Sequence, residues 1–255
     1  MKIVTLMENT ACRGDLVCEH GLSLYIETDE HKILFDAGQS GAFAGNAEKM
    51  GIDLAQVDTA ILSHGHYDHG GGMGRFLEIN DHAPVYLSTH AFELHYNAKG
   101  AYIGLDPYLQ KNNRLRFADG NVQIDEGISL RTLDISSADT SGLTVLEDGH
   151  LRPEKFKHEQ YLLIEEKGKK ILFSGCSHKG ILQIVKHFQP DILIGGFHFM
   201  KIEEKEILRE AAEELLVYPT VYYTGHCTGE KQFAYLKTIM GQQLQYLAAG
   251  STFTL

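Results

Sequence analysis

The chain has 255 residues, of which 43% are hydrophobic, so it can bury a substantial core without disulfide staples. It carries 23 Lys and Arg against 34 Asp and Glu, a formal net charge of −11. This charge disfavours binding to nucleic acid or anionic membranes, because both depend on Lys and Arg neutralising phosphates. The N-terminal apolar run, residues 3–7, is too short for a secretory core, and no stretch resembles a membrane span. We therefore expect a cytoplasmic protein.

Short runs of apolar and β-branched residues recur along the chain and predict β-strands. They lie at residues 2–7, 23–27, 32–35, 59–62, 85–88, 129–133, 161–165, 170–173, 191–194, 220–223 and 245–248. Apolar residues at helical spacing predict helices at residues 42–50, 180–188, 201–216 and 229–240. Because both kinds of element alternate and no Pro- or Ser-rich linker divides the chain, we predict one α/β (or α+β) domain over residues 1–255. Residues from about 96 to 123 are expected to form a long insertion with little regular structure.

Two segments repeat the same order of features. Residues 32–69 and 170–199 each contain a Lys-Ile-Leu-Phe strand, a glycine turn, a helix, a second strand and then histidine. The repeat aligns Asp36 with Cys176, and the region of His64 with His198. Two such βαβ halves would each offer their strand ends to one shared cleft, which is where α/β folds favour ligand sites. A chance match of two short apolar strands is the alternative.

The clearest chemical signal is the sequence SHGHYDHGGG at residues 63–72. It brings together His64, His66, Asp68 and His69, and imidazole and carboxylate groups are ordinary ligands of Zn²⁺ and similar ions. In an extended segment His64 and His66 point to the same side, and a turn near residues 67–69 would aim Asp68 and His69 at a second ion. The spacing therefore predicts ligands for two metals rather than a polar surface loop.

Further candidates follow predicted strands in the second half of the chain. His178 and His226 lie in glycine-containing turns and are predicted to complete the metal shells. Cys176 has two interpretations, a bridging thiolate ligand or a small buried residue at a turn. His198 is predicted to contact substrate or metal, the alternative being a polar residue at a strand end. His158 is either a ligand or part of an exposed turn.

The other polar candidates have plainer interpretations. Solvated surface is expected for several histidines, namely His82, His90, His95, His150 and His187. Of these, His90 follows a predicted strand whose end could reach the cleft. Three basic residues could steer an anionic substrate, although a solvated loop is the favoured interpretation: Lys111, Arg114 and Arg116.

The histidine-rich motif resembles the H-x-H-x-D-H signature of the metallo-β-lactamase superfamily, which includes glyoxalase II and many phosphoesterases. Three further segments look like parts of that family: ILFDAG at 33–38, ILFSGCSH at 171–178 and YTGHCTG at 223–229. The resemblance implies a four-layer αββα sandwich with the metals at one edge of its two sheets. It also implies that His226 binds the second metal, and that Asp36 supports the site by holding a ligand histidine through a hydrogen bond.

The chain departs from the common pattern of this family in two ways. Cys176 stands where relatives have an aspartate that bridges both metals, and no His-Thr-Pro-Gly type segment supplies the usual third histidine of the first metal. His178 instead follows just after the bridging position. GCSH, GGFH and GHCTG together resemble one subgroup, the proteins similar to the methanopterin-pathway synthase that joins a dihydropterin to a ribosyl-aminobenzene phosphate.

These residues predict an enzyme, namely a metal-dependent hydrolase in which a metal-bound hydroxide attacks the substrate. The expected substrate is a small phosphoester, thioester or lactone. It would be anionic if the three basic residues contact it. Asp68 would bind metal and orient the hydroxide, and His198 would donate to the developing negative charge. Two divalent ions are expected, zinc by default, with manganese or iron as alternatives because they accept similar ligands. Two other functions stay open: a methanopterin-type synthase that displaces diphosphate from a pterin, and a non-catalytic metal-binding module. The sequence does not indicate an oligomeric state.

Overall fold

The computed structural model describes residues 1–136 and 142–255, and these divide into two compact units. Unit 1 takes residues 1–119, 142–158 and 248–255, and unit 2 takes residues 120–136 and 159–247. Each unit contains a seven-stranded sheet and its own helices, so the predicted α/β class is correct for both. That the whole chain folds as one domain stays a prediction.

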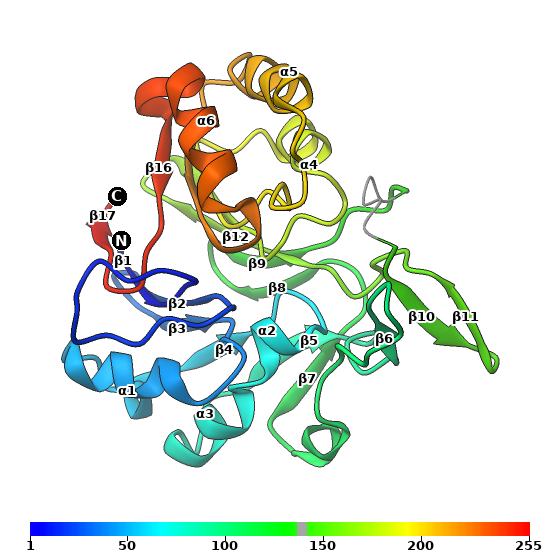
Figure 1. Ribbon diagram of the computed structural model, residues 1–255. Helices are drawn as coiled ribbons and strands as arrows, with labels where there is room; N and C mark the ends of the chain where they lie inside the picture. Colours follow the sequence, from blue (N-terminus) through cyan, green and yellow to red (C-terminus); the bar gives the residue numbers. More distant parts are fainter. Residues whose placement is uncertain (137–141) are drawn as a thin grey trace. The chain divides into compact units, whose positions relative to one another are not determined.

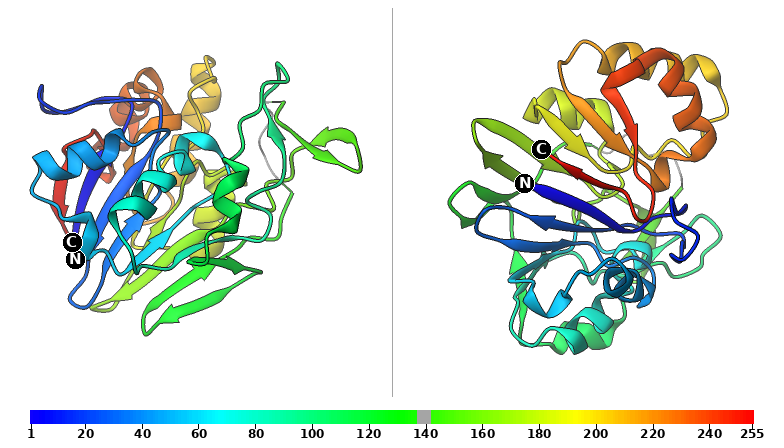
Figure 2. Two further views of the ribbon diagram at one scale, coloured as in Figure 1. Left: turned by 90° about the horizontal axis from the view of Figure 1, so that it is seen from below. Right: turned by 90° about the vertical axis from the view of Figure 1, so that its left-hand side faces the viewer.

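The large sheet of unit 1 has the strand order β17-β1-β2-β3-β4-β5-β7. Its strands are β1 (Lys2–Met7), β2 (Ser23–Glu27), β3 (Lys32–Phe35), β4 (Thr59–Ile61), β5 (Val85–Ser88), β7 (Leu115–Ala118) and β17 (Thr252–Thr254). The strands from β3 to β7 run parallel, so their carboxyl ends meet at one edge of the sheet. The chain termini lie side by side in this unit, where the Leu255 N–H donates to the Met1 carbonyl oxygen at 3.0 Å (Figure 2).

Two helices cover one face of this sheet, α1 (Ala42–Lys49) and α3 (Met73–Ile79) (Figure 1). Phe43 of α1 and Phe76 of α3 are fully buried in one core with strand residues such as Val85. Unit 1 also contains short elements: η1 (Leu54–Gln56), α2 (Tyr67–Gly70), η2 (Pro107–Lys111), and a small sheet of β11 (His150–Pro153), β10 (Thr144–Glu147) and β6 (His95–Tyr96).

The sheet of unit 2 has the order β16-β15-β14-β13-β12-β9-β8. Its strands are β8 (Val122–Asp125), β9 (Ile128–Arg131), β12 (Tyr161–Glu166), β13 (Lys169–Phe173), β14 (Ile192–Ile194), β15 (Val221–Thr224) and β16 (Leu244–Tyr246). The strands from β13 to β16 run parallel. Apolar residues of three helices pack on this sheet in one core: α4 (Ile181–Phe188), α5 (Lys205–Leu215) and α6 (Glu230–Met240) (Figure 1). Two short 3-10 turns complete the unit, η3 (His226–Thr228) and η4 (Gly241–Gln243).

The predicted internal repeat corresponds to a shared local topology. β3, α1 and β4 form a parallel βαβ unit, and so do β13, α4 and β14. The expectation of little regular structure in residues 96–123 needs a correction. This segment contains η2, and its strand β7 pairs in parallel with β5 in the large sheet of unit 1. The reason is that Leu115 and Ala118 are buried, so this short strand extends the sheet. No helix within residues 1–136 and 142–255 has the length and hydropathy to cross a membrane.

Candidate metal centre

Asp36 and Ser63 leave neighbouring parallel strands of unit 1 at the same edge. Phe35 of β3 pairs with Ile61 of β4, so the residues after these strands are adjacent. The Asp36 carboxylate accepts hydrogen bonds from the backbone N–H and from the hydroxyl of Ser63, both at 2.7 Å. It also accepts a hydrogen bond from Nδ1 of His69 at 2.6 Å, and the side chains of Asp36 and His69 are both fully buried. The hydrogen bond predicted between Asp36 and a histidine of the motif is therefore present.

These contacts fix which ring nitrogen of His64 and His69 carries hydrogen. The Ser63 hydroxyl donates its one hydrogen to Asp36, so its oxygen accepts Nδ1–H of His64, 2.8 Å away. His69 likewise donates Nδ1–H to Asp36. Both rings therefore keep a lone pair on Nε2, which is the form that binds a metal ion. A ligand histidine held in this way by a polar group behind it is typical of metal sites, and these residues fit one.

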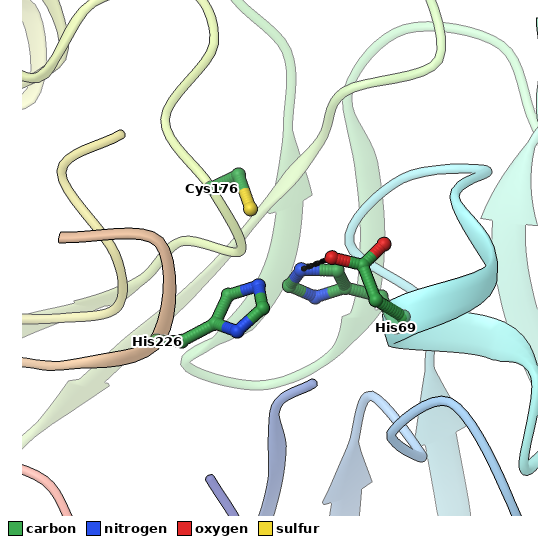
Figure 3. Close-up of side chains that lie close together, drawn as sticks. His69, Cys176 and His226 are labelled. Atoms are coloured by element: carbon green, nitrogen blue, oxygen red, sulfur yellow. Dashed lines mark ion pairs between the residues drawn. The ribbon is translucent and has the colours of Figure 1, made fainter. Parts of the chain in front are cut away.

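Asp68 lies on the single helical turn α2, beside His69, whose side chain is drawn in Figure 3. Its Oδ2 is 3.8 Å from Nε2 of His69 and 3.4 Å from Nε2 of His20. The turn predicted near residues 67–69 is present, and it is helical. His20, whose side chain is 45% exposed, was not singled out in the sequence, because it belongs to no motif or strand end there.

Gly65, between His64 and His66, is in a crowded position. A Cβ atom there would lie 2.1 Å from the carbonyl oxygen of Ala91, whereas at Gly45 of α1 it would meet nothing within 4 Å. Gly65→Ala is therefore expected to lower the free energy of unfolding by about 1–3 kcal/mol. Gly45→Ala, the matched control, is expected to raise it by about 0.5–1 kcal/mol, because alanine suits a helix better. Urea unfolding of both variants measures this, and equal effects would contradict the crowding.

A second group of polar side chains is buried behind the motif in unit 1. His66, His95 and His158 each place a ring nitrogen within 4.8 Å of the other two. Nδ1 of His95 lies 2.6 Å from Oε2 of Glu154, and Nδ1 of His158 accepts the Gly65 N–H at 2.7 Å. The expectation of a solvated His95 is wrong, and so is the exposed-turn alternative for His158, since both are fully buried. The physical reason is that β6 pairs with β10 and carries His95 inward.

The buried position of His66 predicts a pH dependence of stability. Burial lowers the pKa of His66 from 6.5 to about 3, opposed by the Asp68 carboxylate. As the pH falls below about 6.5 the unfolded chain binds a proton at this histidine, but the folded chain does so only near pH 3. The free energy of unfolding of metal-free protein should therefore fall as the pH is lowered through this window.

Urea unfolding between pH 7 and pH 4 tests this expectation. His66→Gln should show a shallower loss of stability than the unmodified chain, because glutamine does not titrate. His31→Gln is the control, since His31 is a partly exposed histidine of the same unit. A His66→Gln variant with an unchanged pH profile would contradict the expectation.

In unit 2 the remaining candidates also leave parallel strands at one edge. Phe173, Ile194 and Tyr223 stand in register on β13, β14 and β15. The segments that follow them contain Cys176, His178, His198 and His226, and Cys176 and His226 are labelled in Figure 3. Parallel strand ends are where α/β sheets place ligand sites. The position of each candidate thus follows from the register of the sheet.

The backbone at this edge is strained and tightly packed. Ser177, His198 and His226 have φ values of 58°, 58° and 48°, which non-glycine residues seldom adopt. A Cβ on Gly195 would lie 1.9 Å from the Ser174 carbonyl oxygen, and one on Gly196 would lie 2.2 Å from Sγ of Cys227. Strain of this kind persists where the surrounding structure holds it, and it is common at functional sites.

Glu159 holds the His178 turn. Its carboxylate accepts the backbone N–H of His178 at 2.7 Å, the backbone N–H of Lys179 at 2.9 Å and the hydroxyl of Tyr161 at 3.0 Å. Burial raises the pKa of Glu159, and these hydrogen bonds oppose the rise. Sequence reasoning passed over Glu159, because its partners include residues 19 and 20 positions away.

Cys176, Cys227 and His198 form a third group, with both sulfurs and a ring nitrogen within 4.8 Å of one another. The Cys227 thiol donates to the Cys176 carbonyl oxygen at 3.6 Å. Burial alone would raise the pKa of the Cys227 thiol, but hydrogen bonds with Cys176 and His198 hold it well below its usual range. Cys227 was not singled out in the sequence. Metal binding by Cys176 and a catalytic role of His198 stay predictions.

The predicted basic residues lie on the surface or support the fold. Arg114 donates to the carbonyl oxygens of Leu77 and Asn80 at 2.6 and 2.5 Å, so it has a structural role. Arg116 donates to the Asn113 carbonyl oxygen at 2.8 Å. His90 is paired with Glu93 at 2.6 Å. That these residues meet a substrate stays a prediction.

Comparison with known proteins gives a consistent result. Residues 16–226 match the family model of the metallo-β-lactamase superfamily. The chain is 29% identical over 263 residues to a 7,8-dihydropterin-6-methyl-4-(beta-D-ribofuranosyl)-aminobenzene-5'-phosphate synthase of Methanocaldococcus jannaschii, covering 91% of this chain and 88% of that protein.

Two solved structures are similar over their whole length. The crystal structure of Tm1679, described as a metal-dependent hydrolase of the beta-lactamase superfamily, matches with a TM-score of 0.84 and 27% identity, covering 100% of this chain and 99% of that one. Zn²⁺-bound PqqB from Methylobacterium extorquens matches in fold, with a TM-score of 0.61 and 12% identity over 100% of both chains. These matches confirm the predicted αββα fold class.

Proposed function

Since the chain belongs to the metallo-β-lactamase superfamily, we propose that the ligand candidates of its two units bind a pair of divalent ions and serve a hydrolase-type reaction. The observation that carries the proposal is that hydrogen bonds hold the ligand histidines of unit 1 in the protonation form that binds metal. The hydrogen bonds of Asp36 and Ser63 place the ring hydrogens of His64 and His69 on Nδ1 and leave a lone pair on each Nε2. Two buried rings held in this form are what a metal site requires.

Zinc is the proposed ion. The candidate donors are imidazoles, one carboxylate and the Cys176 sulfur, and imidazole with thiolate suits zinc better than magnesium or manganese. Bound divalent ions would supply Lewis acidity and lower the pKa of a water ligand toward about 7. The proposed unit 1 ligands are His64, His66, Asp68 and His69, and those of unit 2 are Cys176, His178 and His226.

The protein's own groups have distinct proposed tasks. Asp36 holds His69 in its binding orientation through the 2.6 Å hydrogen bond. Asp68, with an accepting oxygen next to His69, orients the attacking water as well as binding metal. His198, at the strand edge of unit 2, donates a hydrogen bond to the negative charge that develops on the substrate. The proposed substrate is a small molecule with a phosphoester, thioester or lactone bond.

A second candidate function is a synthase reaction that displaces diphosphate from a pterin. The observation that favours it is the identity of 29% to the dihydropterin synthase over 91% of this chain. The two reactions differ in the nucleophile, which is water in the hydrolase and an aromatic acceptor in the synthase. The fold alone does not choose between them.

Elemental analysis and a two-part assay test the proposal. Purified protein is analysed for metal, then assayed with phosphoesters, thioesters and lactones, and separately with a pterin diphosphate plus a ribosyl-aminobenzene phosphate. Metal-dependent hydrolysis supports the hydrolase, and diphosphate release that requires both substrates supports the synthase. Metal without either reaction would point to a binding module. Absence of metal after loading with zinc would overturn the proposal.

A further inference from the structure

The segment that joins β1 to β2, residues 8–22, lies against the Asp68 turn of unit 1. Because α2 is a single turn, the N–H of Gly72, which would bond to Asp68 in a longer helix, donates instead to the Gly38 carbonyl oxygen at 3.1 Å. The Asp68 carbonyl oxygen accepts the N–H of Leu22 at 3.2 Å. The end of this segment is thus tied to the backbone of a proposed metal ligand.

Contacts on both sides of His20 fix its place in the segment. The carboxylate of Glu19 accepts hydrogen bonds from the backbone N–H of Ser40 at 3.0 Å and from its hydroxyl at 2.7 Å. Gly21 is packed so closely that a Cβ atom there would lie 2.6 Å from the Asp68 carbonyl oxygen. The backbone therefore holds His20 beside Asp68, although the His20 side chain is 45% exposed.

Oδ2 of Asp68 has two imidazole nitrogens near it, and they differ in where the hydrogen lies. Nε2 of His69 is 3.8 Å away and keeps a lone pair, because His69 donates its Nδ1–H to Asp36. This pair of electron-rich atoms suits a cation between them. Nε2 of His20 is 3.4 Å from the same oxygen. Since a carboxylate only accepts hydrogen bonds, that contact is favourable when Nε2 of His20 carries the hydrogen.

His20 lies outside the groups of candidate ligand atoms. Among residues 1–136 and 142–255, Asp68 and His69 belong to one group whose atoms lie within 4.8 Å of one another, and His20 belongs to no such group. Its relation to Asp68 is instead that of Asp36 to His69, because carboxylates that bind metals are themselves hydrogen-bonded. A separation of 3.4 Å is long for such a bond, and contacts of this kind often shorten when the site is occupied.

We propose that His20 is a positioning residue for Asp68, donating Nε2–H to Oδ2 so that the carboxylate keeps one orientation toward the metal and the attacking water. This inference rests on the proposed function for the metal itself. The carboxylate has about four lone-pair sites, so accepting from His20 leaves others for the ion and the water. The anchored segment 8–22 brings the donor to Asp68 before any ion binds.

Nitrogen-15 spectra of the histidine rings test the contact in metal-free protein. At a pH where the His20 ring is neutral, we expect its hydrogen on Nε2. In Asp68→Ala the Nε2 signal of His20 should shift, because its acceptor is gone. Hydrogen on Nδ1 of His20, or an Nε2 signal that is the same in both proteins, would overturn the inference. This readout does not depend on whether the proposed function is correct.

Zinc affinity, measured by competition with a coloured chelator, tests the positioning role. His20→Leu is expected to bind zinc about 10–100-fold more weakly, the usual effect of losing a group behind a ligand. His20→Gln should recover most of the affinity, because its amide N–H replaces the imidazole donor. His31→Leu is the matched control, since it removes a histidine–aspartate pair at the amino end of β3, away from the strand ends that carry the motif.

A pair of glycine variants tests the anchoring of the segment with His20 intact. Gly21→Ala should also weaken zinc binding, because its Cβ would push the segment away from the Asp68 turn. Gly14→Ala is the control in the same segment, since a Cβ there would meet nothing within 4 Å. Equal zinc affinity in the two variants would overturn the claim that the backbone of this segment places His20.

Circular dichroism of each metal-free variant separates loss of positioning from loss of fold. A folded His20→Leu protein with full zinc affinity would overturn the inference, as would equal losses in His20→Gln and His20→Leu. If Gly21→Ala does not fold, the His20 variants decide the question. Absence of zinc binding by the unmodified protein would overturn the proposed function instead, while the ring spectra would still decide the contact between His20 and Asp68.

Discussion

The Asp36→Ala variant is expected to lose about 3–5 kcal/mol of its free energy of unfolding, which is typical of breaking a buried charged hydrogen-bond network. Alanine would leave the N–H and hydroxyl of Ser63 and Nδ1–H of His69 buried without their acceptor. It would also be strained at the φ of 58° that Asp36 adopts. Urea unfolding of metal-free protein measures the loss.

The matched control is Asp58→Ala, in the same unit. Asp58 pairs with Nδ1 of His31 at 3.2 Å, but its side chain is 39% exposed. The pair itself should therefore contribute about 0–1 kcal/mol. The Asp36→Asn variant separates the two causes of the loss, because asparagine tolerates the left-handed backbone better than alanine and so removes most of the strain.

A similar loss of unfolding free energy in Asp36→Ala and Asp58→Ala would show that burial of the Asp36 hydrogen-bond network has little effect on stability.

Replacing His69 with alanine is expected to remove at least one metal ion per chain and to lower metal-dependent activity by more than about 100-fold, the upper range for loss of a residue behind a ligand. The reason is that His69 is the buried ring whose Nε2 lone pair is fixed by Asp36. Elemental analysis and the rate with the best substrate are measured on the same sample. His82→Ala is the control, because the His82 side chain is 56% exposed and pairs with the neighbouring Asp81. Unchanged metal content and rate in His69→Ala would refute the ligand assignment.

The motif at residues 63–72 could be interpreted from sequence because its chemistry is local. Ligand spacing, the strand before it and the glycines after it all lie within a dozen residues, and β4 does end just before it. The parallel repeat was predictable for the same reason, since each βαβ unit is a contiguous segment. What spacing could not show is the crowding at Gly65, because Ala91 is distant in sequence.

His95 and Glu154 illustrate what the sequence does not contain. The two residues are 59 positions apart, and β6, which carries His95, has only two residues. A two-residue strand has no periodicity to detect, and an isolated histidine is usually exposed. Only the pairing of β6 with β10 brings His95 inward. Glu159 escaped notice in the same way, since its role comes from the folded position of the His178 turn.

Some elements were missed for reasons of composition. The helices α2 and α3 follow or include a run of glycines, which disfavour helices when judged from propensity alone. In the hairpin of β10 and β11, every residue of β11 is exposed, so the sequence shows no alternation of apolar and polar residues that would indicate a strand. Tertiary context decides both cases.

Anomalous diffraction from a zinc-loaded crystal tests the central claim most directly. The proposal predicts zinc peaks within bonding distance of the candidate ligands, which include His64 and His69 of unit 1 and His178 and His226 of unit 2. No zinc peak beside His64 and His69 at saturating zinc would contradict it.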